Sequence, residues 1–130
     1  MSEPRVIRVV IVDDHAMVRR SLRFALLDLQ DIDVVGEAAD GEEALRVCGE
    51  LHPDMVLLDL WLPGLDSIET IRTLRRQRPT PKVLVHTADY DERLISEALA
   101  AGACGYLVKG ELTELLAAIR TAHGRRQTTA

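Results

Sequence analysis

The chain has 130 residues, of which 47% are hydrophobic and 28% are charged, which is enough for one domain with a hydrophobic core. Its formal net charge of −5 argues against nucleic-acid binding by the domain itself, because no basic excess attracts phosphate. No apolar stretch approaches the ~20 residues of a membrane span, and the N-terminal "MSEPRVIR" does not resemble a signal peptide, so a cytoplasmic protein without membrane contact is expected.

Five short apolar runs, rich in β-branched residues, predict β-strands. Four of them are almost continuously apolar, which is typical of strands covered on both faces, whereas the second is weaker and is a candidate edge strand. In chain order the predicted strands are Val6–Val12, Val34–Glu37, Met55–Leu58, Lys82–Thr87 and Gly105–Val108.

Between and after these strands, apolar residues recur at helical spacing and predict five amphipathic helices. Their apolar stripes lie within Met17–Leu29, Ala44–Leu51, Ile68–Leu74, Leu94–Leu99 and Leu112–Ile119. The alternation predicts a doubly wound α/β fold with a five-stranded parallel sheet and helices on both of its faces. We expect one domain over residues 1–123, followed by a polar tail or the start of a linker over residues 124–130.

Several reactive or charged side chains are expected to be structural. Cys48 and Cys104 are predicted to be reduced core thiols, because two cysteines without an export signal do not indicate a disulfide. Neither His15 nor His86 is assigned a ligand role, and His86 is expected to be a core histidine. The clustered arginines are expected to form solvated helix faces, with a partner patch as the less favoured alternative: Arg19, Arg20, Arg23, Arg72, Arg75, Arg76 and Arg78.

Polar side chains stand at the carboxyl ends of four predicted strands. Asp13 and Asp14 follow the first strand, Asp59 follows the third, Thr87 ends the fourth and Lys109 follows the fifth. Because ligands bind at this edge of a doubly wound sheet, the five side chains are expected to converge there.

Such a cluster needs positive charge. Two carboxylates about 4 Å apart repel each other by about 4 kcal/mol at an effective dielectric constant of about 20. Magnesium prefers carboxylate and carbonyl oxygens, and a metal ion with Lys109 and Thr87 could stabilise a phosphoryl group accepted by Asp59. Taken singly, Asp14 could cap a helix, Asp59 could be a turn residue, and Thr87 and Lys109 could be structural; their joint placement favours a site.

The same segments carry a family resemblance. "VVIVDDH", "PDMVLLDLWLPGLDSIE", "VLVHTA" and "AGACGYLVKG" resemble the receiver domain of two-component response regulators, over roughly Val6 to His123. The "DDH" opening, "AGACGYLVKGE" and the last predicted helix, "ELLAAIRTAHG", are most similar to regulators of the NarL/LuxR type.

The resemblance implies a flavodoxin-like sheet in the strand order 2-1-3-4-5, a phosphoacceptor, a metal site and a switch. Asp59 would be the phosphoacceptor, Thr87 and Lys109 would contact the phosphoryl group, and Tyr106 would be the aromatic switch residue, although a core ring is the structural alternative for Tyr106. Magnesium would be held by Asp13, Asp14, Asp59 and the backbone carbonyl of Trp61.

The resemblance also implies partners. A sensor histidine kinase would supply the phosphoryl group, and the domain would catalyse its own phosphorylation and dephosphorylation but turn over no separate substrate. The phosphorylated form would be a homodimer that controls transcription through a DNA-binding helix-turn-helix domain absent from this chain. The alternative is a stand-alone receiver that acts by binding another protein.

Three positions depart from the usual family pattern, D-L-x-M-P-x-x-x-G after the phosphoacceptor and a proline after the lysine. Leu62 replaces methionine, which conserves volume, Ser67 replaces glycine, and Gly110 replaces the proline. Ser67 is expected to alter only the entry to the third helix.

Two other uses of this architecture fit less well. A flavodoxin-like flavin binder needs amide donors for phosphate after the first strand, where this chain has two repelling aspartates. A haloacid-dehalogenase-like phosphatase needs D-x-D at that place and a cap domain, for which 130 residues leave no room.

Overall fold

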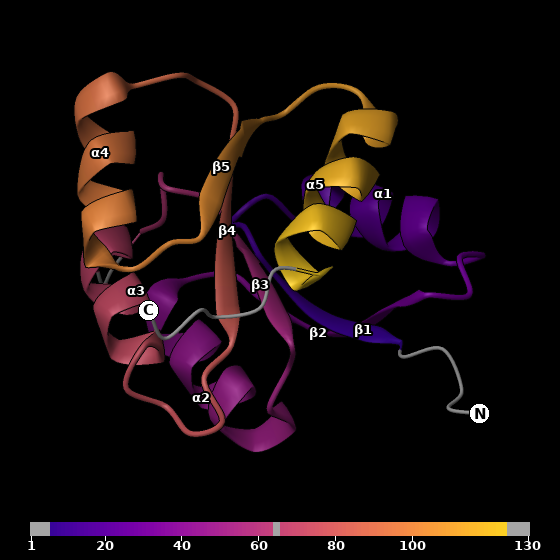
Figure 1. Ribbon diagram of the computed structural model, residues 1–130, viewed down its shortest axis with the longest axis horizontal. Helices are drawn as coiled ribbons and strands as arrows, with labels where there is room; N and C mark the ends of the chain where they lie inside the picture. The colour runs from indigo at the N-terminus through magenta and orange to yellow at the C-terminus, as the bar shows by residue number, and fades with distance from the viewer. Residues whose placement is uncertain (1–5, 64–65, 125–130) are drawn as a thin grey trace.

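The computed structural model describes residues 6–63 and 66–124, in which strands and helices alternate along the chain (Figure 1). The strands are β1 (Ile7–Val12), β2 (Ile32–Ala38), β3 (Met55–Leu58), β4 (Lys82–Thr87) and β5 (Gly105–Val108). The helices are α1 (Ala16–Leu26), α2 (Gly41–Leu51), α3 (Ser67–Leu74), α4 (Glu92–Ala101) and α5 (Leu112–Gly124).

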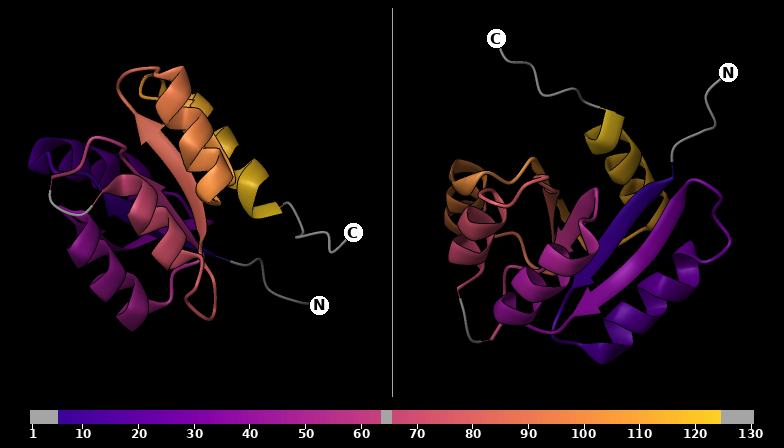
Figure 2. Two further views of the ribbon diagram at one scale, coloured as in Figure 1. Left: turned by 90° about the vertical axis from the view of Figure 1, so that its left-hand side faces the viewer. Right: turned by 90° about the horizontal axis from the view of Figure 1, so that it is seen from below.

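The five strands form one parallel sheet in the order β2-β1-β3-β4-β5, which confirms the predicted 2-1-3-4-5 topology. Successive side chains of a strand point to opposite faces, so β1 contributes Val9 and Ile11 to one core and Val10 and Val12 to the other. The first core is closed by α1 and α5 and the second by α2, α3 and α4, and Figure 2 shows these helices on either side of the sheet. Both faces of the central strands are therefore covered.

Of the two edge strands of the sheet, one was predicted correctly and the other was not. β2 is an edge strand, as its weaker pattern indicated, and it is longer than predicted. β5 is also an edge strand, and its side chains are not covered on both faces: Tyr106 is 43% exposed and Val108 is 36% exposed. An apolar run of four residues could not show this, because coverage depends on where α4 and α5 lie.

Aspartates begin three of the helices. Asp40, Asp66 and Asp91 each accept a hydrogen bond from a backbone N–H in the first turn of α2, α3 and α4. Helix α1 begins after His15, and no side chain caps it. Asp14 therefore does not cap this helix.

The two cysteines differ in environment. Cys48 is buried in the core, and burial raises the pKa of its thiol to about 12. Cys104 is exposed, so the prediction that both are core thiols was wrong for Cys104, which lies at the rim where β5 begins.

The limits of the domain stay a prediction. Helix α5 ends at Gly124, and most of the expected tail lies outside the described residues. Among the helices within 6–63 and 66–124, none combines the length and the apolar character that crossing a bilayer requires.

Candidate functional site

The backbone fixes the residues that follow β1, β3 and β5. The amide of Asp13 donates to the carbonyl of Ala38 at 3.1 Å, and the amide of Asp59 donates to the carbonyl of Val12 at 3.0 Å. At the other end of the cluster, the amide of Lys109 donates to the carbonyl of Thr87 at 2.6 Å. The parallel ladder thus continues one residue past these strands, and the three charged side chains meet at one edge of the sheet.

One ammonium group joins two buried carboxylates. Lys109 Nζ lies 2.5 Å from Asp13 Oδ2 and 3.3 Å from Asp59 Oδ2. Asp13 is 2% exposed and Asp59 is 4% exposed, so water screens their charges little. The lysine offsets part of the repulsion that two adjacent carboxylates would otherwise produce.

The pKa values reflect this pairing. Burial raises the pKa of Asp13, but hydrogen bonds from Lys109 and His15 outweigh burial and hold the pKa below its ordinary value. Burial lowers the pKa of Lys109, but the two aspartates outweigh it and raise the pKa. Both partners are therefore held in their charged forms at neutral pH.

Asp14 and His15 complete the cluster on its open side. Ligand atoms of Asp13, Asp14, His15 and Asp59 all lie within 4.8 Å of one another. His15 Nδ1 is 3.0 Å from Asp13 Oδ1 and 3.0 Å from Asp14 Oδ1, a contact that the sequence did not predict. Three carboxylates around one small space are a donor set that suits Mg²⁺, which takes a few carboxylates and keeps several waters.

Trp61 is placed by the phosphoacceptor candidate. Its amide donates to Asp59 Oδ1 at 3.1 Å, which makes a tight turn directly after β3. Its side chain is 52% exposed and faces Arg93, Leu94 and Glu97 of α4 across a shallow pocket. The main chain of Trp61 is thus held against the carboxylate while its ring lies outside the core.

Thr87 and Tyr106 share the region of the site but make other contacts. Thr87 is fully buried, and its hydroxyl donates to the carbonyl of Asp89 at 3.4 Å. Tyr106 points outward, with its ring centroid 5.9 Å from that of Tyr90 and the planes tilted by 56°. The alternative of a core ring for Tyr106 was wrong.

Ser67 contributes more than the sequence indicated. Its side chain is buried, and its hydroxyl donates to the carbonyl of Leu60 at 2.7 Å and lies 3.4 Å from the carbonyl of Asp59. The expectation that it alters only the entry to α3 was therefore too narrow. The replacement of the usual glycine by serine marked this position in the sequence, but the sequence could not show which carbonyl groups the Ser67 hydroxyl contacts.

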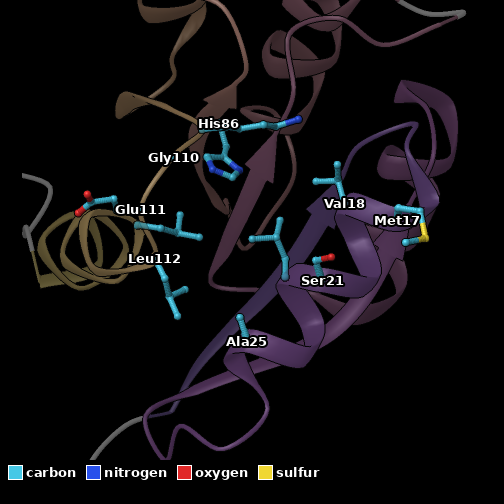
Figure 3. Close-up of a pocket in the computed structure, with 11 residues that line it drawn as sticks. Met17, Val18, Ser21, Ala25, His86, Gly110, Glu111 and Leu112 are labelled. Carbon is cyan, nitrogen blue, oxygen red and sulfur yellow. The ribbon is translucent and has the colours of Figure 1, made fainter.

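A cavity of about 380 Å³ lies behind the cluster, between α1 and α5 (Figure 3). Val18 and Ala25 of α1 and Leu112 of α5 line it, and His86 of β4 closes its end near Lys109. His86 is buried, as expected, and burial together with the charge of Lys109 lowers its pKa to about 4. The imidazole is therefore neutral at pH 7.

This edge of acidic residues and one lysine, on a five-stranded doubly wound sheet, agrees with the comparison of the chain with known families. Residues 9–120 match the model of the response regulator receiver domain. The chain belongs to this family.

Named response regulators and transcriptional regulators are similar to this receiver domain in sequence. The transcriptional regulatory protein LiaR of Bacillus subtilis is 42% identical over 118 residues, which cover 90% of this chain and 56% of LiaR. The response regulator UvrY of Escherichia coli is 38% identical over 119 residues, which cover 91% of this chain and 55% of UvrY. The receiver domain thus spans about half the length of the curated relatives that it matches.

Solved structures show the same fold as the receiver domain. The response regulator domain of Thermotoga maritima CheB superposes with a TM-score of 0.84 at 34% identity, covering 94% of this chain and 99% of that one. A LuxR-family response regulator from Aurantimonas sp. SI85-9A1 also gives 0.84, at 37% identity, covering 93% and 88%. The resemblance to NarL/LuxR-type regulators is confirmed.

Proposed function

We propose that this receiver domain accepts a phosphoryl group on Asp59 from a phosphohistidine of a sensor histidine kinase, in the cytoplasm and with Mg²⁺ bound. The bond from phosphorus to the histidine nitrogen breaks, and a bond from phosphorus to a carboxylate oxygen of Asp59 forms. The observation that carries the proposal is the buried cluster in which Lys109 Nζ contacts Asp13 and Asp59 at the carboxyl edge of the sheet.

Each residue of the cluster has a proposed task. Asp13, Asp14, Asp59 and the carbonyl of Trp61 would hold Mg²⁺, which supplies positive charge for the phosphoryl oxygens. Lys109 would move from two carboxylates toward the new phosphoryl oxygens, since it already lies 3.3 Å from Asp59 Oδ2. The domain would catalyse its own phosphorylation and dephosphorylation without turning over another substrate.

The proposed switch uses Thr87 and Tyr106. The present bond of the Thr87 hydroxyl to the carbonyl of Asp89, at 3.4 Å, is long and therefore weak. A phosphoryl group on Asp59 would offer that hydroxyl a charged acceptor, and Tyr106 would leave Tyr90 and turn inward. Moving the equilibrium from 1:99 to 99:1 takes about 5.5 kcal/mol of differential interaction.

We further propose that the output is transcriptional. The relatives are named as transcriptional regulators or response regulators and are about twice as long as the matched region. A homodimer of phosphorylated receivers would bring together two DNA-binding domains, one attached to each receiver. A stand-alone receiver that binds another protein is the alternative, and full-length sequence beyond residue 130 discriminates the two.

The test is intact-protein mass spectrometry after incubation with a small-molecule phosphodonor, with and without Mg²⁺. Wild type should gain the mass of one phosphoryl group only with Mg²⁺, and Asp59→Asn should gain none. The control is Asp28→Asn, which makes the same chemical change at an exposed position.

A phosphoryl gain in Asp59→Asn would show that another residue is the acceptor. No gain in wild type would contradict the proposed function. In either case the acidic cluster would require another explanation.

A further inference from the structure

Arg19 reaches the acidic loop from helix α1. Its Nη1 donates to the backbone carbonyl of Asp13 at 2.7 Å, and its Nε donates to Glu37 Oε1 on β2 at 3.1 Å. One guanidinium thus ties together α1, β2 and the residue that follows β1. The side chain is 19% exposed, so the expectation of a solvated arginine face was wrong for Arg19.

Glu37 is itself held in place. Its second oxygen, Oε2, accepts from Arg23 Nε at 2.7 Å, and Arg23 Nη1 donates to the carbonyl of Val34 at 3.3 Å. Burial raises the pKa of Glu37, but hydrogen bonds from Arg23 and Arg19 outweigh burial and hold the pKa below its ordinary value. Glu37 is therefore a charged anchor that fixes the plane of the Arg19 guanidinium.

The bond to Asp13 bears on the metal site through the main chain. Asp13 supplies a carboxylate to the cluster, and Asp14, the next residue, supplies another. A charge-assisted hydrogen bond is roughly twice as strong as a neutral one, and the guanidinium fork directs it in one plane. A donor fixed on the carbonyl of Asp13 restricts the peptide between the two aspartates and hence the directions of both carboxylates.

We propose that Arg19 is a positioning residue for the divalent-cation site, acting through the carbonyl of Asp13 and anchored by Glu37. The proposal rests on the proposed function, because it presumes that the aspartates hold Mg²⁺. Magnesium demands near-ideal octahedral geometry, so ligands whose directions are less restricted bind it more weakly. Loss of groups that orient metal ligands typically costs 10- to 100-fold in affinity, and about 10-fold is expected here.

Because Arg19 is positively charged, a positioning role and a purely electrostatic role have different effects on Mg²⁺ binding. A cation near the site repels Mg²⁺, so removing the charge alone would tighten binding. Loss of positioning weakens binding. The two explanations therefore predict opposite signs for Arg19→Gln.

The experiment measures the Mg²⁺ dissociation constant of the purified protein by isothermal titration calorimetry. Fluorescence of Trp61, the single tryptophan, gives a second readout because its amide bonds to Asp59. The variants are Arg19→Gln and Arg19→Lys, with Arg20→Gln as a control that removes the same charge from an exposed neighbour. Urea unfolding without Mg²⁺ shows that each variant is folded, and Arg19→Lys keeps the charge and stem should Arg19→Gln fail to fold.

The positioning role predicts that affinity falls from wild type to Arg19→Lys and further to Arg19→Gln, by about 10-fold in all, while Arg20→Gln stays near wild type. Tighter binding by Arg19→Gln with unchanged Arg19→Lys would overturn the proposal in favour of a charge effect, and unchanged affinity in both would overturn it outright. Wild type that binds no Mg²⁺ would contradict the proposed function, and the inference with it.

Discussion

Single hydroxyl and imidazole groups near the site have measurable consequences. Ser67 and His86 both lie close to the acidic cluster, and both are buried. The first is neutral and acts through hydrogen bonds to the main chain, whereas the second acts through its protonation state. Their substitutions therefore test different properties of the domain.

Ser67→Ala removes the donor to the carbonyl of Leu60 without changing charge. Because a buried acceptor left without its partner costs about 1–3 kcal/mol, the free energy of unfolding should fall by about 1–2 kcal/mol. Urea unfolding measures the change. The matched control is Ser96→Ala at an exposed position of α4, for which a change within about 0.5 kcal/mol is expected. Equal effects of the two variants would show that the Ser67 bond adds nothing.

His86 makes stability depend on pH. A base with a lowered pKa in the folded state contributes fully above its unfolded value of 6.5 and loses that contribution as the pH falls toward about 4. Between pH 7 and pH 5 this is a loss of about 2 kcal/mol. His86→Gln, which does not titrate, should lose about 2 kcal/mol less than wild type in urea unfolding over the same interval. An equal loss of unfolding free energy in wild type and His86→Gln would show that His86 does not cause the pH dependence.

Two glycines in or next to helices differ in the backbone conformation that they adopt. Helix α4 is capped at its C-terminal end by Gly102, whose φ of 122° lies in a region that L side chains rarely adopt. Gly49 lies within α2, where an added Cβ would meet no atom closer than 3.8 Å. The same substitution should therefore act in opposite directions at the two glycines.

Gly102→Ala should lower the free energy of unfolding by more than about 1 kcal/mol, because alanine is strained at this φ. Gly49→Ala should raise it by about 0.5 kcal/mol, because glycine weakens a helix. Thermal or urea unfolding of both variants compares the signs. A gain in stability for Gly102→Ala would show that the end of α4 adapts at little cost.

Strand bounds were predictable where the local sequence pattern determines them and not where pairing or packing with distant residues does. The bounds of β3, β4 and β5 match the predicted runs because those runs are short, apolar and flanked by turn residues. β2 extends beyond its predicted run at both ends, since Asp33 interrupts the apolar pattern before Val34, while pairing with β1 includes Ile32, Asp33 and Ala38. The exposure of β5 depended on packing and had no local signal.

The site was predictable to the extent that topology places it. Asp13, Asp59 and Lys109 meet because parallel strands end at one edge, which the alternation of elements already indicated. The contacts of Arg19 and His15 with the acidic loop were not predictable, because they depend on the conformation of that loop.

At the scale of the whole molecule, the proposed metal site links ligand binding to stability. At a free Mg²⁺ concentration 100 times the dissociation constant, the free energy of unfolding should rise by about 2.7 kcal/mol. Asp14→Asn should abolish most of this increment, since it removes one of the clustered carboxylates, while Asp28→Asn should keep it. Urea unfolding with and without Mg²⁺ measures both. An increment that survives in Asp14→Asn would place the metal elsewhere.

The ion pairs of Lys109 join residues that are far apart along the chain. Its partners Asp13 and Asp59 lie 96 and 50 residues away. A nascent chain that has not yet added β5 therefore has the carboxylates but not their counter-charge. Under the proposed function, phosphoryl transfer to Asp59 would therefore begin only after β5 has been synthesised and has joined the sheet, and a fragment that ends before Lys109 would not be phosphorylated.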